Sequence, residues 1–199
     1  MVCIIKETIR KKQFLEESLV AKASAPLKAI WRRSRKTAAT ASQLVTKGIL
    51  GTSLITPQEA YTVGLLHDAG VILLMRRFPQ YTQSIKSIES GMTLKPKKEE
   101  AKFGLHHANA SYLMAQFWRM GTDIQLAVRY HHRLKKAPLT PKAEELLLVL
   151  WLADQLLFGR SDEGTRALDL LGLTERVTPT VLKSLLAKID TKNPDTDTL

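Results

Sequence analysis

The sequence has one cysteine in 199 residues, Cys3, and no long apolar run. A single cysteine cannot form an internal disulfide, and no basic segment near the amino terminus precedes an apolar stretch long enough for export. The longest apolar run, residues 146–153, has eight residues, whereas a membrane-spanning helix needs about 20. We therefore expect a cytoplasmic protein without membrane contact, in which this run belongs to a buried helix.

Strand patterns are missing as well, because no segment alternates apolar and polar residues over the length of a strand. Three Thr-Pro pairs, at residues 56–57, 140–141 and 178–179, instead predict helix starts, since threonine caps free amides and proline tolerates the first helical position. We predict an all-α fold, with helices over residues 2–20, 26–47, 57–77, 79–90, 101–118, 122–134, 140–158 and 179–189.

Glycine and charge predict the boundaries between these helices. Gly48 and Gly121 are expected to end the helices that precede them, and residues 95–100 are expected to form a charged connector. We expect a single domain with amino-terminal helices over residues 1–48, a core over 49–159, carboxyl-terminal helices over 160–189 and a disordered tail over 190–199.

The net charge is +11, and the basic excess lies in the amino-terminal part of the chain. Residues 1–48 carry 11 Lys and Arg against 3 Glu, whereas residues 160–199 carry 6 against 7 acidic residues. A basic region can bind nucleic acid, an acidic partner or a phosphorylated ligand. Because aromatic residues are only 6% of the chain and do not interleave with the basic ones, a solvated helix face is favoured over a base-stacking surface.

Residues 64–75 place His67 beside Asp68 inside an otherwise apolar run. Imidazole and carboxylate side chains bind divalent transition metals, but two ligands do not make a site. Metal-assisted hydrolysis of a phosphate ester needs further His or Asp side chains from other helices.

Several motifs, in order, resemble the HDOD family of bacterial signalling domains, a branch of the HD superfamily of metal-dependent phosphohydrolases. They are Trp-Arg-x-Ser from Trp31, GLLHDAG from Gly64, FGLHHANASYLMAQFW from Phe103 and AVRYHH from Ala127. The resemblance covers roughly residues 27–158. Together with the helical periodicity it implies an HD-superfamily-like bundle of about seven to nine helices.

The resemblance also implies a set of site residues. His67 and Asp68 fall on the dyad for which the superfamily is named, and Asp154 falls on its distal aspartate. Further histidines of the pattern fall on His107, His131 and His132. From the residues alone, a cationic imidazole near the end of a helix is also favoured as a cap. A capping or packing role is therefore the preferred interpretation of His131 and His132.

The chain departs from the catalytic pattern at position 33. A catalytic HD enzyme has a metal-binding histidine there, whereas this chain has Arg33, and no histidine precedes His67. Arginine offers no lone pair and stays charged. In addition, His106 stands where the family usually has Asp, and residues 119–121 read Arg-Met-Gly where it usually has Gly-Leu-Pro. An intact hydrolytic site is therefore not expected.

Three interpretations of His67 and Asp68 follow. The favoured one is a structural pair whose hydrogen bonds hold helices together. The second is a vestigial metal site that also uses Asp154. In the third, basic side chains hold a phosphate where the metal once sat, namely Arg33 with Arg32, Arg35 or Lys36.

For the whole protein we expect a non-catalytic HDOD-type regulatory module that acts through a protein partner or a homodimer and needs no cofactor. The family's usual helical half before Trp31 is expected to be truncated, which would leave apolar surface for such a partner. One alternative is a residual phosphohydrolase that uses a divalent transition metal and acts on a nucleotide or cyclic dinucleotide. Another is a binder of nucleic acid or of a phosphorylated ligand through residues 32–36.

Overall fold

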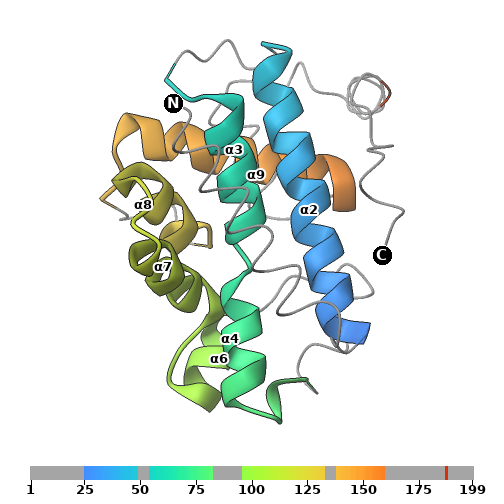
Figure 1. Ribbon diagram of the computed structural model, residues 1–199, viewed down its shortest axis with the longest axis vertical. Helices are drawn as coiled ribbons and strands as arrows, with labels where there is room; N and C mark the ends of the chain where they lie inside the picture. The colour runs from blue at the N-terminus through green and yellow to red at the C-terminus, as the bar shows by residue number, and fades with distance from the viewer. Residues whose placement is uncertain (1–24, 49–53, 83–95, 133–137, 160–186, 188–199) are drawn as a thin grey trace.

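The computed structural model describes residues 25–48, 54–82, 96–132 and 138–159, together with residue 187. Within these ranges all regular secondary structure is helical, as predicted. The helix predicted over residues 2–20 lies outside the described residues, as do the one predicted over 179–189, apart from residue 187, and most of the one predicted over 79–90. The described helices (Figure 1) are α2 (Ala25–Thr46), α3 (Pro57–Leu66), α4 (Gly70–Arg77), α6 (Pro96–Phe103), α7 (His107–Phe117), α8 (Thr122–Tyr130) and α9 (Pro141–Phe158).

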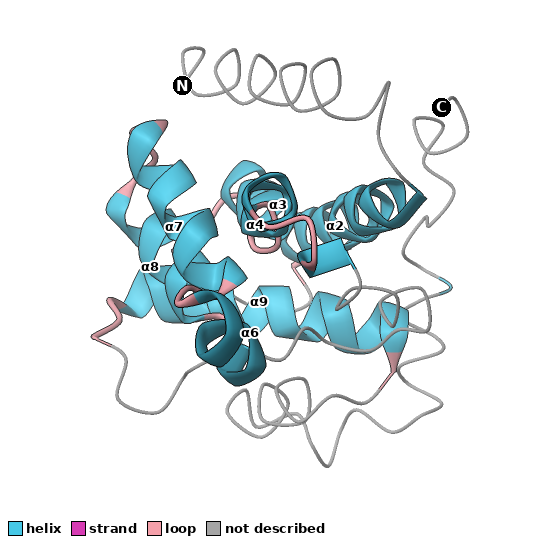
Figure 2. Ribbon diagram, turned by 90° about the horizontal axis from the view of Figure 1, so that it is seen from below, coloured by secondary structure: helices cyan, strands magenta, loops and turns pink. Residues whose placement is uncertain are grey.

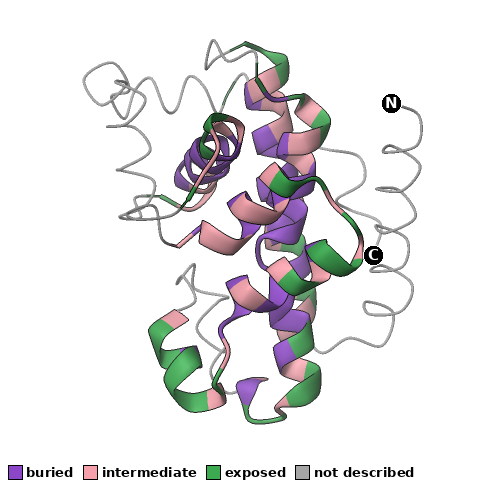
Figure 3. Ribbon diagram, turned by 90° about the vertical axis from the view of Figure 1, so that its left-hand side faces the viewer, coloured by how far each residue is buried: buried purple, intermediate pink, exposed green. Residues whose placement is uncertain are grey.

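Helix α9 packs against α2, α3 and α8, and it runs across one side of α2 and α3 (Figure 2). Its apolar run 146–153 is buried on every side, as expected for a helix that is apolar all round. Helices α2 and α3 run side by side over one face of α9, and α8 packs beside α9 with α7 next to it. Buried residues gather on the sides of the helices that face one another (Figure 3). In the described part of the chain no helix combines the length and the apolar character needed to cross a bilayer.

The helix starts predicted from Thr-Pro pairs are confirmed at α3 and α9. Thr56 Oγ1 accepts a hydrogen bond from the Glu59 amide (3.2 Å), and the Thr56 amide donates to Glu59 Oε2 (2.9 Å). These two bonds form a complete capping box. Thr140 Oγ1 likewise accepts from the amide of Ala143 (3.0 Å) at the start of α9.

The prediction of one continuous helix over residues 57–77 is wrong, because α3 ends at Leu66 and α4 begins at Gly70. The side chain of Ser111 on α7 stabilises the break. The Gly70 amide donates to Ser111 Oγ (2.7 Å), and the Ser111 hydroxyl donates to the carbonyl oxygen of His67 (2.8 Å). A tertiary contact thus replaces bonds that a continuous helix would have made within itself.

Two other boundaries differ from the prediction. Residues 96–100 belong to α6 rather than to a connector. The helix predicted over 101–118 is two helices, α6 and α7, with Gly104 between them at a φ of 71°. Residue His106 caps α7, because its Nδ1 accepts a hydrogen bond from the amide of Asn109 (3.4 Å). A capping role fits the resemblance, since the family's usual Asp at this position is also a good cap.

The turn between α7 and α8 does not use Gly121 as predicted. Helix α7 ends at Phe117, and the residue in the left-handed region after it is Arg119, with a φ of 52°. Gly121 instead precedes α8 as its cap residue. At the end of α2, by contrast, Gly48 has a φ of 62°, as predicted.

Candidate metal centre

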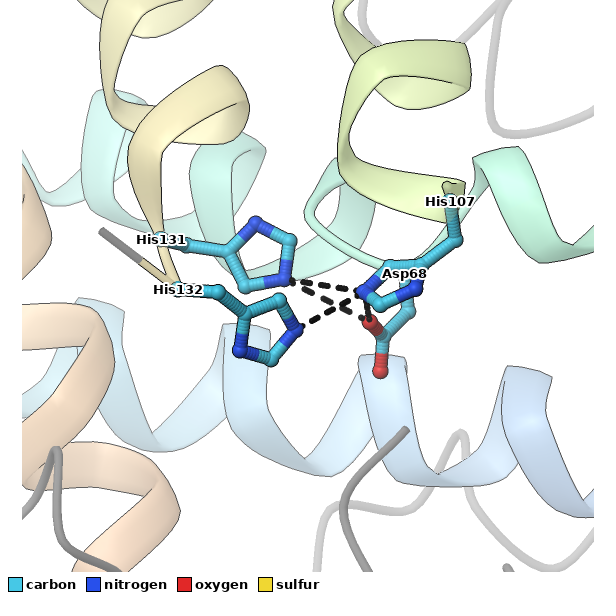
Figure 4. Close-up of side chains that lie close together, drawn as sticks. All are labelled: Asp68, His107, His131 and His132. Carbon is cyan, nitrogen blue, oxygen red and sulfur yellow. Dashed lines mark hydrogen bonds and ion pairs between the residues drawn. The ribbon is translucent and has the colours of Figure 1, made fainter. Parts of the chain in front are cut away.

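Four side chains from three places in the fold come together at one point (Figure 4). Asp68 lies in the break between α3 and α4, His107 is the first residue of α7, and His131 and His132 directly follow α8. One ligand atom from each lies within 4.8 Å of the ligand atoms of the others. The break that the sequence did not predict therefore turns Asp68 toward α7 and α8.

The hydrogen bonds of Nδ1 in His107 and His131 determine which ring atoms face Asp68. His107 Nδ1 lies 2.7 Å from Glu99 Oε2, and His131 Nδ1 lies 2.7 Å from the carbonyl oxygen of Val128. Both partners only accept hydrogen bonds, so each Nδ1 carries its hydrogen and each neutral ring has its lone pair on Nε2. The sequence predicted the bond from His131 to the end of α8, and the same bond leaves Nε2 free for the centre.

The acceptor atoms converge on one point. The Nε2 atoms of His107 and His131 lie 3.3 Å apart. The Oδ1 atom of Asp68 lies 3.4 Å from Nε2 of His107 and 3.7 Å from Nε2 of His131. His132 Nε2 lies 2.8 Å from His107 Nε2 and can donate to it in one tautomer or supply a fourth lone pair in the other. A cation satisfies such a set of acceptors, and imidazole with one carboxylate suits a divalent transition metal.

Glu99 on α6 orients His107. Its Oε2 accepts from the amide of His107 (2.9 Å) and from Nδ1, and its Oε1 accepts from the hydroxyl of Tyr81. Burial alone would raise the pKa of Glu99, but the hydrogen bonds from His107 and Tyr81 outweigh it and lower the pKa. No pattern in the sequence indicates this role, because Glu99 stands in a charged segment that resembles a surface connector.

The protonation of the centre also suits a metal. Burial would raise the pKa of Asp68, but the charge of His67 and its hydrogen bond to Asp68 outweigh it, so the pKa lies well below its usual value. Burial lowers the pKa of His131 to about 4, against the opposing effect of Asp68. Burial and the charges of its neighbours lower the pKa of His132 well below its usual value. Near neutral pH the centre thus has one carboxylate and neutral imidazoles at 131 and 132.

His67 and Asp154, which the sequence put with Asp68 in a vestigial site, lie outside this group of four. His67 Nδ1 bonds the carbonyl oxygen of Gly64 (2.7 Å), and its Nε2 faces Asp68 Oδ2 (3.1 Å). Burial lowers the pKa of His67, but Asp68 outweighs burial through its charge and hydrogen bond and raises the pKa. With both nitrogens turned to acceptors, His67 is a hydrogen-bond donor to Asp68, as the structural interpretation of the pair expected.

Arg33 forms an ion pair with Asp154 and stacks on Phe158. Its Nη2 lies 2.7 Å from Asp154 Oδ1, and its guanidinium lies 3.9 Å from the ring centroid of Phe158. Burial raises the pKa of Asp154, and the charge of Arg33 offsets only part of that effect. The other predicted anion contacts, Arg32 and Lys36, are exposed one turn apart on α2.

Helix α9 fixes the end of α8 beside the centre. The Trp151 indole N–H donates to the carbonyl oxygen of His131 (2.7 Å), which is the C-cap residue of α8. Both groups are buried. The two histidines after α8 are thus anchored by the most apolar helix of the fold.

A protein-family model for the HDOD domain matches residues 5–134, which is more than half of the chain. The chain belongs to the HDOD family. The resemblance inferred from the motifs is therefore confirmed. Among curated proteins, an uncharacterized protein of Treponema pallidum (strain Nichols) is 25% identical over 81 residues, which are 40% of this chain and 16% of that protein.

Three solved structures share the fold of this HDOD protein. The chain is 23% identical to "Putative phosphohydrolase" from Shewanella amazonensis SB2B (TM-score 0.55, 81% of this chain and 60% of that one). It is 23% identical to "Putative signal transduction protein" from Marinobacter aquaeolei VT8 (TM-score 0.60, 81% of this chain and 37% of that one). It is 19% identical to an HDOD domain protein with unknown function from Geobacter sulfurreducens (TM-score 0.59, 85% of this chain and 60% of that one). The chain thus spans 37–60% of the length of these structures, and at such identities the likeness shows the fold alone.

Proposed function

We propose that this HDOD protein is a non-catalytic signal-transduction module that acts by binding another protein. The observation that carries the proposal is the ion pair between Arg33 and Asp154. In the catalytic HD pattern both positions supply metal ligands. In this chain one is a fixed cation and the other is bonded to it.

The charge of Arg33 opposes a metal ion among His67, Asp68 and Asp154. At about 5 Å and an effective dielectric near 20, a guanidinium repels each charge of a cation by roughly 3 kcal/mol. Asp154 would also have to leave its bond with Arg33 to become a ligand, and breaking this partly buried pair leaves an uncompensated charge. These costs support a site that has lost the metal arrangement used for hydrolysis.

The four-residue centre still fits one divalent transition metal, so the proposal includes an ion held by Asp68, His107, His131 and His132. When bound, the ion supplies a positive charge that joins the break after α3 to the ends of α7 and α8. Such an ion has a structural or sensory role here, since coupling metal binding to the packing of helices needs no turnover.

Phosphate release tests the proposal. The full chain, purified without chelators and supplied with Mn²⁺, Fe²⁺ or Zn²⁺, should release no more nitrophenol from bis(p-nitrophenyl) phosphate, and no more product from a cyclic dinucleotide, than the D68N variant does. Release by the native chain that D68N abolishes would overturn the proposal.

A metal-dependent phosphohydrolase acting on a nucleotide or cyclic dinucleotide is the second candidate. The convergent donor group supports it, and so does the fold shared with the Shewanella protein of that name. Under this candidate the native chain releases product, and activity requires the metal that Asp68 and the three histidines hold.

A binder of nucleic acid or of a phosphorylated ligand through residues 32–36 is the third candidate. Arg33 is engaged by Asp154 and Phe158, while Arg32 and Lys36 are exposed. Arg33 is therefore not free to join Arg32 and Lys36 on one anion. Filter binding of DNA and RNA that shows a salt-dependent affinity in the native chain, lowered by R32E, would favour this candidate.

A further inference from the structure

We propose that the outward side of α7 is the docking surface for an acidic protein partner. The surface, called here the α7 face, consists of Tyr112, Leu113, Gln116, Phe117, Arg119 and Arg129. The inference rests on the proposed function, because it assigns a place and a chemistry to the partner of a module that acts by binding.

The α7 face exposes apolar side chains that a solvated helix would normally bury. The side chain of Phe117 is 84% exposed and that of Leu113 is 52% exposed. The two residues are four apart on α7, so they are neighbours on one side of the helix. The other large apolar residues of comparable exposure in the described part of the chain are Leu54 and Leu73. Leu113 and Phe117 therefore concentrate exposed apolar surface on one side of α7.

Ordered polar and aromatic groups adjoin the apolar pair. Gln116 Nε2 donates to the hydroxyl of Tyr112 (2.8 Å). The guanidinium of Arg129 on α8 lies 4.6 Å from the ring centroid of Tyr112 and 5.4 Å from that of Tyr130. Tyr, Phe and Arg are enriched in protein interfaces, and side chains already held in place lose less entropy on binding.

Charge selects the occupant of the α7 face. Arg129 stacks on rings, Arg119 is exposed, and neither forms an ion pair with a carboxylate of the described residues. A second copy of this chain would bring another net charge of +11 and the same two guanidinium groups. Unpaired cations beside an apolar pair are instead complementary to a segment with apolar residues flanked by Asp or Glu.

The opposite side of the same helix carries the metal centre. His107 and Ser111 are buried on α7, and Ser111 bonds the break that holds Asp68. Helix α7 lies at the edge of the molecule away from α2 (Figure 1), so its outer side can be reached without disturbing the centre. A partner at the α7 face would therefore contact the helix whose first residue is a candidate ligand.

Site-specific photo-crosslinking tests this inference in the organism's own cells. The full chain carries p-benzoylphenylalanine in place of Phe117, and a matched chain carries it in place of Leu73, an exposed apolar residue on α4. We expect a protein adduct at position 117 that is absent at position 73. The crosslinked segment of the partner should have a net negative charge and apolar residues at helical or extended spacing.

A synthetic peptide of that segment then measures the contribution of charge. We expect its affinity for the purified full chain to fall at least tenfold in R129E and to stay within twofold of native in R76E, which reverses an exposed charge on α4. Circular dichroism verifies that both variants are folded.

Besides the absence of any adduct, four outcomes would overturn the inference. They are an adduct only with a second copy of this chain, a crosslinked segment without net negative charge, equal affinities of R129E and R76E, and an adduct at position 73 alone. The last outcome leaves the proposed protein-binding function standing while removing the α7 face. Absence of adducts at both positions contradicts both proposals, and phosphate release by the native chain contradicts the proposed function alone.

Discussion

At the scale of single residues, Glu99 determines whether His107 can bind a metal. Its carboxylate holds Nδ1–H and so directs the lone pair of Nε2 toward Asp68. We predict that E99Q weakens Zn²⁺ or Co²⁺ affinity by about 10–100-fold, the usual effect of removing the partner of a ligating histidine. Competition with a chelating indicator measures this affinity.

The matched control for this prediction is E100Q, which makes the same change at an exposed neighbour on α6. E100Q should leave the affinity within twofold of native. Equal affinities of E99Q and the native chain would show that Glu99 does not act on the metal through His107.

Arg119 is the second residue with a specific consequence. Its φ of 52° places a side chain in the left-handed region, where an L-residue is strained and glycine is not. The resemblance places the family's usual glycine at this position. We predict that R119G raises the free energy of unfolding by about 0.5–1 kcal/mol, measured by urea denaturation. R119A keeps a Cβ and should give no such gain, so a gain of equal size in R119A would refute the explanation by backbone strain.

At the scale of elements, the junction of α4 and α7 depends on the absence of a side chain at Gly70. A Cβ there would lie 2.2 Å from the carbonyl oxygen of His107 and 2.5 Å from the amide nitrogen of Ser111. Both are backbone atoms and cannot rotate away. We predict that G70A lowers the free energy of unfolding by about 1–3 kcal/mol or more, because α7 must move.

G70A should also weaken metal binding, since Asp68 and His107 lie on the two sides of this contact. The control is G121A, because a Cβ at Gly121 meets no atom within 4 Å. G121A should change stability by less than about 0.5 kcal/mol. A stable G70A variant would mean that α4 and α7 are not held this closely.

The start of α3 is joined to α9 through Glu59, whose Oε1 lies 2.7 Å from Lys142 Nζ. Burial would raise the pKa of Glu59, but the bond to Lys142 and the amide of Thr56 outweigh it and lower the pKa. Because the pKa of Glu59 is lower in the folded state than in the unfolded state, ionised Glu59 stabilises the fold at any pH above its unfolded-state pKa. This stabilisation is lost as the pH falls through the folded-state pKa. We predict that the native chain loses more free energy of unfolding than E59Q between about pH 5 and pH 3.

Urea denaturation across this range measures the difference. An E59Q variant with the native slope would show that the contribution of the capping box does not depend on ionisation.

At the scale of the whole molecule, a metal ion should stabilise the fold, because its ligands come from the α3–α4 break, the start of α7 and the end of α8. Binding to the folded state alone adds about 3 kcal/mol at a free metal concentration 100 times the dissociation constant. We predict that Zn²⁺ or Co²⁺ raises the Tm of the native chain relative to chelator, in thermal unfolding followed by circular dichroism. The rise should be absent in D68N, and its persistence there would place the ion elsewhere.

Several features that depend on residues close together in the sequence were predicted correctly. The capping box at Thr56, the cap at Thr140 and the left-handed Gly48 involve partners at most four residues apart. The buried helix around residues 146–153 followed from its uniform apolar character. The motif around His67 and Asp68 likewise indicated the family that the comparison confirmed.

The tertiary structure decided the features that join distant segments. The break after Leu66 depends on Ser111, which lies 41 residues from its partner Gly70. The bond between Arg33 and Asp154 spans 121 residues. The sequence offered His67, Asp68 and Asp154 as the vestigial metal ligands, whereas packing of three separate elements gathered Asp68 with His107, His131 and His132. Local propensity sets where a helix starts, but hydrogen bonds and burial between helices set which polar side chains face one another.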